Sequence, residues 1–263
     1  MPIQLPKLKD GQKIYFASDF HLGAPNHQES RQREQQIIKW LDQISSDAAA
    51  LFLVGDIFDF WFEYKHVIPK GFIRLQGKLA ALADQGIPIY LFVGNHDMWM
   101  FDYFKEELNL DIHYDSQEFD INGKSFLVGH GDGLGPNDRF YKFIKRIFRN
   151  KGCQWLFGRL HPNLGMWIAQ TWSNKSRKSH GVQDEKFHGD GEHLTAYCRS
   201  VSKTKSYDYF IFGHRHLPIK VPINDSCTYF NLGEWINYQT YGVFDGDNME
   251  LRAFEKDLVV FGD

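Results

Sequence analysis

The sequence lacks several features that would define a class of protein at once. It has only three cysteines, Cys153, Cys198 and Cys227, and no C-x-x-C pair, which argues against a disulfide framework or a thiolate zinc site. No apolar run approaches the roughly 18 residues that a membrane span needs. The first residues, MPIQLPKLKDGQK, contain no apolar segment of a secretory signal. We therefore expect a cytoplasmic protein with reduced thiols.

Acidic side chains are scarce in one segment of the chain. The 263 residues carry a net charge of −3, and hydrophobic residues make up 43% of them, which is ordinary for a globular protein with a core. Between Gly135 and His180, however, ten basic residues accompany a single acid, Asp138. This segment carries +9 and leaves −12 on the remainder of the chain. Such an asymmetry predicts an anionic partner for the segment.

Five short apolar runs end in polar side chains. The runs are KIYFASDFH, ALFLVGDIFD, PIYLFVGNHD, KSFLVGHGD and YDYFIFGHRH, and they predict strands that are buried on both faces. Helical patterns at 31–44 and 72–86 alternate with them, which predicts an α/β fold. The ligand site of such a fold lies beyond the carboxyl ends of its strands. The side chains expected at that edge are Asp19, His21, Asp56, Asp59, Asn95, His96, Asp97, His130, Asp132, His214 and His216.

These clusters contain the chemistry of a metal site. A single D-x-H or G-H-x-H pattern arises easily by chance, but five clusters that each follow an apolar run are not a chance pattern. Oxygen and nitrogen ligands without thiolate favour Mn²⁺, Fe²⁺ or Zn²⁺. Seven ligands with one shared carboxylate suit two ions about 3.5–4 Å apart, an arrangement used for displacement at phosphorus. The seven are Asp19, His21, Asp56, Asn95, His130, His214 and His216. Glycines precede four clusters, and we expect them to permit tight turns: Gly55, Gly94, Gly129 and Gly213.

The order of the motifs resembles that of a known superfamily. D-x-H, G-D-x-x-D, G-N-H-D, a later His before Gly, and G-H-x-H resemble the calcineurin-like metallophosphoesterases, from Asp19 to His216. The resemblance implies a single α/β domain over residues 1–263, a four-layer αββα sandwich with a dinuclear metal site. One ion would be held by Asp19, His21, Asp56 and His216. The other would be held by Asp56, Asn95, His130 and His214, with Asp56 bridging the two.

The same resemblance implies a catalytic role for a residue outside the ligand set. His96 would stabilise charge on the phosphate or on the leaving oxygen. Asp97 or Asp59 would help to hold His96 in position. The sequence leaves open which of the two carboxylates does so.

Within the superfamily, the chain resembles the UDP-2,3-diacylglucosamine hydrolases of lipid A biosynthesis. GDIFDFWFEY resembles their second motif, HGDGLGPNDRFYKFIKRIF their fourth, and SNKSRKS at residues 173–179 the end of their helical insertion. Such enzymes cleave the pyrophosphate of a UDP-linked, doubly acylated sugar to UMP and the acylated sugar 1-phosphate. The resemblance implies this reaction with two divalent ions, Mn²⁺ before Fe²⁺ or Zn²⁺, at the cytoplasmic face of the inner membrane. The expected substrate contacts are Asn95, Lys175, Arg177, Lys178 and His214.

One residue supports an alternative function. The best-known of these hydrolases have Arg in G-N-R-D, whereas this chain has His96 in the G-N-H-D of the wider superfamily. Because this position should touch the phosphate, the alternative is a phosphodiesterase or phosphatase acting on a nucleotide or another phosphate ester. A non-catalytic scaffold with the same fold is disfavoured, since all seven ligands are present.

The segment 135–180 predicts a basic, aromatic helical insertion without reference to any family. We expect Asn137 or Asp138 to cap its first helix and Gly152 to end it. Such a helix suits a membrane surface, or a lid over an anionic, amphiphilic nucleotide-sugar lipid. The alternative is a hairpin that docks its apolar face on the protein's own core. Nucleic acid is the competing anion, but the acidic remainder argues against a stable complex with it. One apolar helix face is expected to consist of Phe140, Phe143, Ile144, Ile147 and Phe148.

Overall fold

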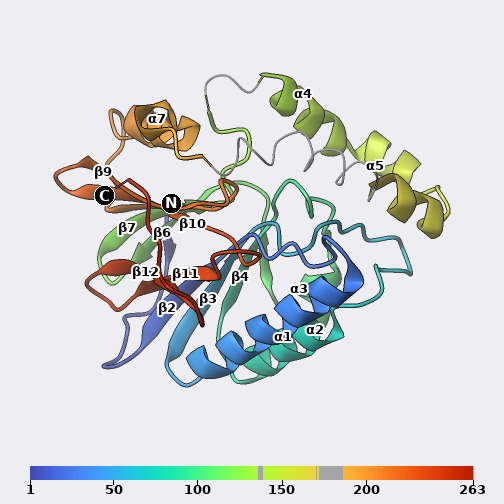
Figure 1. The fold of residues 1–263 in the computed structure, drawn as a ribbon, viewed down its shortest axis with the longest axis horizontal. Helices are drawn as coiled ribbons and strands as arrows, with labels where there is room; N and C mark the ends of the chain where they lie inside the picture. Colours follow the sequence, from blue (N-terminus) through green and yellow to red (C-terminus); the bar gives the residue numbers. More distant parts are fainter. Residues whose placement is uncertain (136–138, 170, 172–185, 263) are drawn as a thin grey trace.

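Two six-stranded sheets pack face to face at the centre of the protein (Figure 1). The structure is a computed structural model and describes residues 1–135, 139–169, 171 and 186–262. The first sheet has the order β12-β11-β2-β3-β4-β5. Its strands are β2 (Lys13–Ala17), β3 (Ala48–Val54), β4 (Ile89–Phe92), β5 (Asp111–His113), β11 (Thr240–Phe244) and β12 (Met249–Ala253). The second sheet has the order β1-β6-β7-β8-β10-β9. Its strands are β1 (Ile3–Gln4), β6 (Gln117–Ile121), β7 (Lys124–Gly129), β8 (Tyr209–Phe212), β9 (Pro218–Asn224) and β10 (Cys227–Leu232).

Helices cover the outer face of each sheet. The first sheet is covered by α1 (His27–Ile44), α2 (Ile73–Asp84) and α3 (Tyr103–Leu108), and the second by η1 (Gly189–Gly191) and α7 (His193–Val201) (Figure 1). The helices expected at 31–44 and 72–86 are α1 and α2. Four layers in the order helix, sheet, sheet, helix result, and the predicted αββα sandwich is confirmed.

The apolar runs are continuous because both faces of the central strands are buried. In β3, Leu51 and Leu53 pack under α1 and α2, whereas Phe52 and Val54 pack between the two sheets. The ring of Phe52 stacks on Phe16 of β2, with their centroids 4.7 Å apart. Burial on both faces removes the polar alternation that a half-exposed strand would show.

The described part of the insertion stands apart from the sheets as α4 (Arg139–Phe148), α5 (Lys151–Phe157) and a helix over residues 162–169 (Figure 1). The prediction that Gly152 ends the first helix is wrong. The helix ends at Phe148, and the Asn150 side chain caps α5 by accepting from the N–H groups of Gly152 and Cys153 at 2.9 and 3.1 Å. An Asn N-cap outweighs a glycine stop at this point. The expected caps Asn137 and Asp138 lie outside the described residues. In the described part of the chain, no helix is long and apolar enough to cross a bilayer.

Candidate metal centre

The five motifs meet where strands of both sheets end. β2, β3 and β4 belong to the first sheet, and β7 and β8 to the second. Hydrogen bonds join the two sets of loops directly. The N–H of His214 donates to Asp19 Oδ2 at 3.0 Å, and Nδ1 of His130 lies 2.9 Å from the carbonyl oxygen of Val54. Since Nδ1 of His130 faces a carbonyl, Nε2 is the ring nitrogen left for a metal ion.

Two groups of potential ligands share the carboxylate of Asp56. Within each group, the ligand atoms lie within 4.8 Å of one another. Nε2 of His130 is 3.3 Å from Asp56 Oδ2 and 3.2 Å from Asn95 Oδ1. Nε2 of His216 is 3.2 Å from Asp19 Oδ1. The first group is Asp19, His21, Asp56 and His216, and the second is Asp56, His130 and His214.

The donor atoms of this centre fit divalent cations. Asp19 Oδ1 belongs to the first group and is buried; it makes no hydrogen bond of good geometry among the described residues, although Nε2 of His216 lies 3.2 Å from it. The two Nε2 atoms of His21 and His216 approach each other to 3.1 Å. Carboxylate, amide and imidazole donors without a thiolate suit borderline and hard divalent ions. An orphaned buried carboxylate oxygen is costly unless a cation or a proton meets it.

Backbone strain is concentrated in the same residues. Five of the seven expected ligands have a left-handed φ that non-glycine residues rarely adopt. The values are 54° for Asp19, 44° for His21, 52° for Asp56, 68° for His214 and 56° for His216. Strained conformations of this kind cost about 1–3 kcal/mol each and persist where the surroundings hold them. The fold therefore holds several ligands in position at a cost to its stability.

The charges of the centre are balanced by protons where no cation is bound. Burial alone would lower the pKa of His130, but the charge of Asp56 overrides burial and raises the pKa to about 10. Burial is likewise opposed at His216, where the carboxylate of Asp19, 3.2 Å from Nε2, raises the pKa to about 9. At His214, burial and the neighbouring His130 lower the pKa to about 4. A bound cation would replace the protons of His130 and His216.

The glycines before the ligands are required mostly for space. Only Gly55 of the four has a positive φ, 85°, and a Cβ there would lie 2.4 Å from Nδ1 of His130. At Gly94 a Cβ would lie 2.1 Å from Asp56 Oδ1, and at Gly213 2.5 Å from Asp19 Oδ2. At Gly129 it would meet the Ser116 hydroxyl at 2.2 Å. The expected role in turns therefore holds for Gly55, and the other three keep room for neighbouring side chains.

His96 lies beside the ligands, and the two carboxylates proposed to hold it behave differently. Its Nδ1 lies 3.0 Å from the carbonyl oxygen of Asp59 and 3.7 Å from Asp59 Oδ1. Asp97 is fully buried and accepts from backbone N–H groups, at 2.7 Å from Gly94 and 2.8 Å from Ile57. It also accepts from the N–H of Asp56 at 3.3 Å. Asp59 thus contacts His96, whereas Asp97 holds the loop that carries Asp56.

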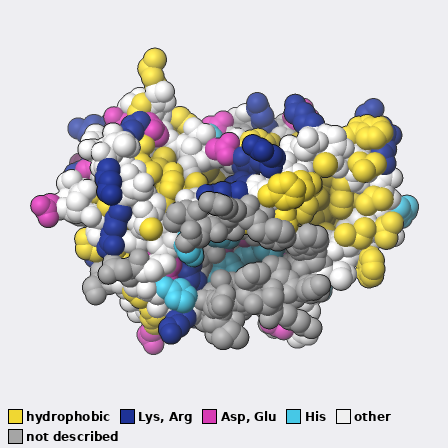
Figure 2. Space-filling model, turned by 90° about the horizontal axis from the view of Figure 1, so that it is seen from above, with side chains coloured by type: hydrophobic (Ala, Val, Ile, Leu, Met, Phe, Trp, Pro, Cys, Tyr) yellow, Lys and Arg dark blue, Asp and Glu magenta, His cyan; other side chains and the backbone are white. Residues whose placement is uncertain are grey.

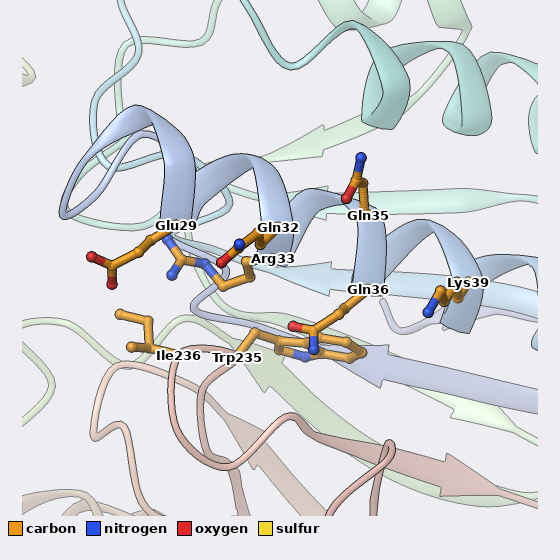
Figure 3. A pocket seen from close by; sticks show the side chains of 8 residues that line it. All are labelled: Glu29, Gln32, Arg33, Gln35, Gln36, Lys39, Trp235 and Ile236. Atoms are coloured by element: carbon orange, nitrogen blue, oxygen red, sulfur yellow. The ribbon is translucent and has the colours of Figure 1, made fainter.

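A pocket of about 400 Å³ lies between α1 and the segment Trp235–Ile236 (Figure 3). Two of its lining residues support the ligand loops. The guanidinium of Arg33 is buried and donates to the carbonyls of Phe20 and His21, both at 2.7 Å. The N–H of Trp235 donates to the carbonyl of Asp19 at 3.2 Å. Sequence patterns did not reveal Arg33, because a basic residue on a helix is usually solvated.

The described part of the insertion exposes many apolar side chains. Phe143 is 60% exposed and Ile147 39%, so the alternative in which this face docks on the protein's own core is wrong for both, whereas it is confirmed for Phe148, which packs on the core beside Trp99. Figure 2 shows hydrophobic side chains gathered toward one end of this face of the molecule, with Lys and Arg beside them. Seven of the fourteen exposed large apolar residues of the described chain lie here: Phe143, Ile147, Trp155, Leu156, Leu164, Trp167 and Ile168. The expected phosphate contacts Lys175, Arg177 and Lys178 lie outside the described residues.

Known proteins resemble the chain over most of its length. The sequence model of the calcineurin-like phosphoesterase family matches residues 12–218. A UDP-2,3-diacylglucosamine hydrolase of Porphyromonas gingivalis is 36% identical over 256 residues, which cover 92% of this chain and 98% of the relative. The hydrolase of the same name from Actinobacillus succinogenes is 27% identical, over 85% of this chain and 92% of its own. Among solved structures, the phosphoesterase Yfce from E. coli covers 93% of this chain and 94% of its own at 16% identity, with a TM-score of 0.48.

Proposed function

The chain belongs to the calcineurin-like phosphoesterase family, and from this premise we propose that it hydrolyses the pyrophosphate of UDP-2,3-diacylglucosamine. The products are UMP and 2,3-diacylglucosamine 1-phosphate. The observation that carries the proposal is the relative at 36% identity, which is named for this substrate and aligns over 92% of this chain. An exposed apolar insertion near a centre suited to phosphate chemistry is what a doubly acylated anion requires.

Two divalent ions, Mn²⁺ before Fe²⁺ or Zn²⁺, are the proposed cofactors. When bound, ions of this kind neutralise phosphate charge and activate water for in-line displacement at phosphorus. The first ion would be held by Asp19, His21, Asp56 and His216. The second would be held by Asp56, Asn95, His130 and His214. The close approach of ligand atoms of Asp56, His130 and His214 supports this second set.

His96 is the proposed group that stabilises charge on the phosphate or the leaving oxygen. Its Nδ1 faces the carbonyl of Asp59 and therefore carries a proton. To stabilise a phosphate oxygen or to protonate the leaving group, the ring must donate from Nε2. The N–H of His96 also donates to Asp56 Oδ1 at 2.8 Å, which ties this residue to the bridging carboxylate.

The insertion is the proposed contact with acyl chains and with the membrane surface. Trp155, Leu156 and Trp167 are each more than 60% exposed, and the Arg159 guanidinium lies 4.7 Å from the Trp155 ring centroid. Aromatic side chains next to cations suit the interface of an anionic bilayer. The protein would then act at the cytoplasmic face of the inner membrane, and no stable complex with nucleic acid is expected.

A direct comparison of substrates tests the proposal. The purified protein with Mn²⁺ is assayed on the acylated UDP-sugar in detergent micelles and on a soluble phosphodiester. We expect rapid turnover of the lipid and slow turnover of the soluble ester. Efficient hydrolysis of the soluble ester without hydrolysis of the lipid would instead support the alternative that His96 favours, a phosphodiesterase or phosphatase on a nucleotide or another phosphate ester.

A further inference from the structure

Helix α4 faces the body of the protein with polar side chains. Tyr141 and Lys145 lie one turn apart and both reach Asp132 in the loop after β7. The Tyr141 hydroxyl donates to Asp132 Oδ2 at 2.6 Å, and Nζ of Lys145 lies 2.5 Å from the same oxygen. The opposite side of the helix carries the exposed Phe143 and Ile147. The contact with Asp132 is therefore made by hydrogen bonds and charge. Phe143 and Ile147 of the apolar face are left outward, whereas its last residue, Phe148, packs on the core.

The carboxylate in this contact lies next to the metal centre. Asp132 follows the expected ligand His130 by two residues and is only 6% exposed. Nζ of Lys145 also donates to the backbone carbonyl of Asp132 at 3.1 Å. A buried carboxylate with a charged partner and a hydroxyl donor forms strong hydrogen bonds, and it is costly to leave unpaired.

The end of α4 is held by a second motif of the centre. The indole N–H of Trp99 donates to the carbonyl of Phe148 at 2.8 Å. Trp99 lies two residues after the last residue of the G-N-H-D motif, Asp97. The rings of Trp99 and Phe148 are also in contact, with centroids 5.3 Å apart. The helix is thus attached to the loops after β4 and β7, which both supply ligands of the second proposed ion.

We propose that Asp132 is a positioning residue, which holds α4 through Tyr141 and Lys145 and thereby sets the place of the apolar face relative to the metal centre. The consequence for catalysis rests on the proposed function, because only a substrate with acyl chains needs the insertion. Loss of the contact should raise KM for the acylated UDP-sugar and leave the hydrolysis of a small soluble phosphodiester unchanged.

Hydrogen exchange of the α4 amides tests the contact without any assay of activity. In Lys145→Met and Tyr141→Phe, exchange should accelerate about tenfold, as expected when a hydrogen bond to a charged group is lost and the helix opens more often. Arg146→Met is the matched control, since it removes a cation from the exposed side of the same helix. The effects of Asp132→Asn and Lys145→Met should be less than additive in the double variant, because the Lys145 contact is lost in either case and only the contact with Tyr141 remains to be weakened.

The outcomes separate the two proposals. If the α4 amides exchange at the same rate in Lys145→Met and Tyr141→Phe as in Arg146→Met, the proposal that Asp132 holds α4 is overturned. Faster exchange with an unchanged KM for the lipid overturns the role of Asp132 in placing the substrate. If the wild-type protein does not hydrolyse the lipid, the proposed function fails, and the exchange measurement still decides whether Asp132 holds α4.

Discussion

Nε2 of His130 lies 3.3 Å from Oδ2 of Asp56, although the two residues follow strands of different sheets. The metal centre is therefore built across the interface between the sheets. Neither sheet contains the whole ligand set, so the packing of the sheets and the geometry of the centre depend on each other.

Metal affinity should rise with pH. The pKa of His130 is raised to about 10 and that of His216 to about 9, so both rings hold protons at pH 7 where no cation is bound. Each ion must displace such a proton, and affinity should increase about tenfold per pH unit for every proton released. Titration calorimetry of Mn²⁺ at pH 7 in buffers of different ionisation enthalpy measures the release. We expect about two protons per protein, and binding without proton release would contradict the assignment.

Replacement of the bridging carboxylate should disable both ions. In Asp56→Ala, the bound Mn²⁺ should fall from two to less than one per protein, since both groups of ligands share this residue. Loss of a residue that only supports a metal ligand typically lowers activity by roughly 10–100-fold. Loss of Asp56, itself a proposed ligand of both ions, should lower activity by more than this. Metal content by mass spectrometry and turnover of the lipid give the two readouts. Asp84→Ala, on the exposed end of α2, is the control and should match the wild type.

Asp97 should contribute to stability more than its place in a catalytic motif suggests. The carboxylate of Asp97 is fully buried and accepts hydrogen bonds from backbone N–H groups. In Asp97→Asn, an NH₂ donor takes the place of one carboxylate oxygen and faces these N–H donors. The free energy of unfolding should decrease by about 1–3 kcal/mol, the cost of leaving a buried donor unsatisfied. Urea denaturation measures it. A stable Asp97→Asn protein that had lost only activity would point to a direct catalytic role instead.

Substitutions at His96 should show what this residue contributes to turnover of the lipid. His96→Ala should lower kcat on the lipid by about 10²–10⁴-fold, the range for a lost general acid, with little change in bound metal. His96→Arg places a cation at the position where the best-known hydrolases have Arg, and should be much faster than His96→Ala. If His96→Arg is as slow as His96→Ala, His96 has a role that a cation alone does not fill.

The exposed tryptophans of the insertion should contribute to membrane binding. Trp155→Ser and Trp167→Ser remove side chains that are 61% and 63% exposed. Each should weaken binding to vesicles of anionic phospholipid by about tenfold or more, since an indole at the interface buries a large apolar area. Ile73→Ser, at an apolar position that is 74% exposed at the start of α2, outside the insertion, is the control. Equal binding by all three variants would argue against the insertion as the contact.

The sequence by itself determined the α/β class and the set of polar residues that follow the strands, because strands buried on both faces are continuous apolar runs that end where the sheet ends. The four-layer sandwich was implied by the order of the motifs, through the family resemblance. That the ligands come from the ends of two sheets, and not from one edge of a single sheet, was decided by the tertiary structure. The single-domain organisation and the ligand roles stay predictions. Local patterns were weaker at element ends, where the cap at Asn150 rather than Gly152 decides how α4 gives way to α5.

Only the tertiary structure decided which face of α4 meets the protein. Helical spacing correctly separates an apolar side of α4 from a polar side, but it does not show which part of the protein the helix packs against. In this fold that surface is the buried carboxylate of Asp132, so Tyr141 and Lys145 turn inward and Phe143 is left exposed. The close approaches at Gly94 and Gly213 have the same origin, because their neighbours come from another strand or from the other sheet. Contacts between segments that are distant along the chain leave no periodic signal in the sequence.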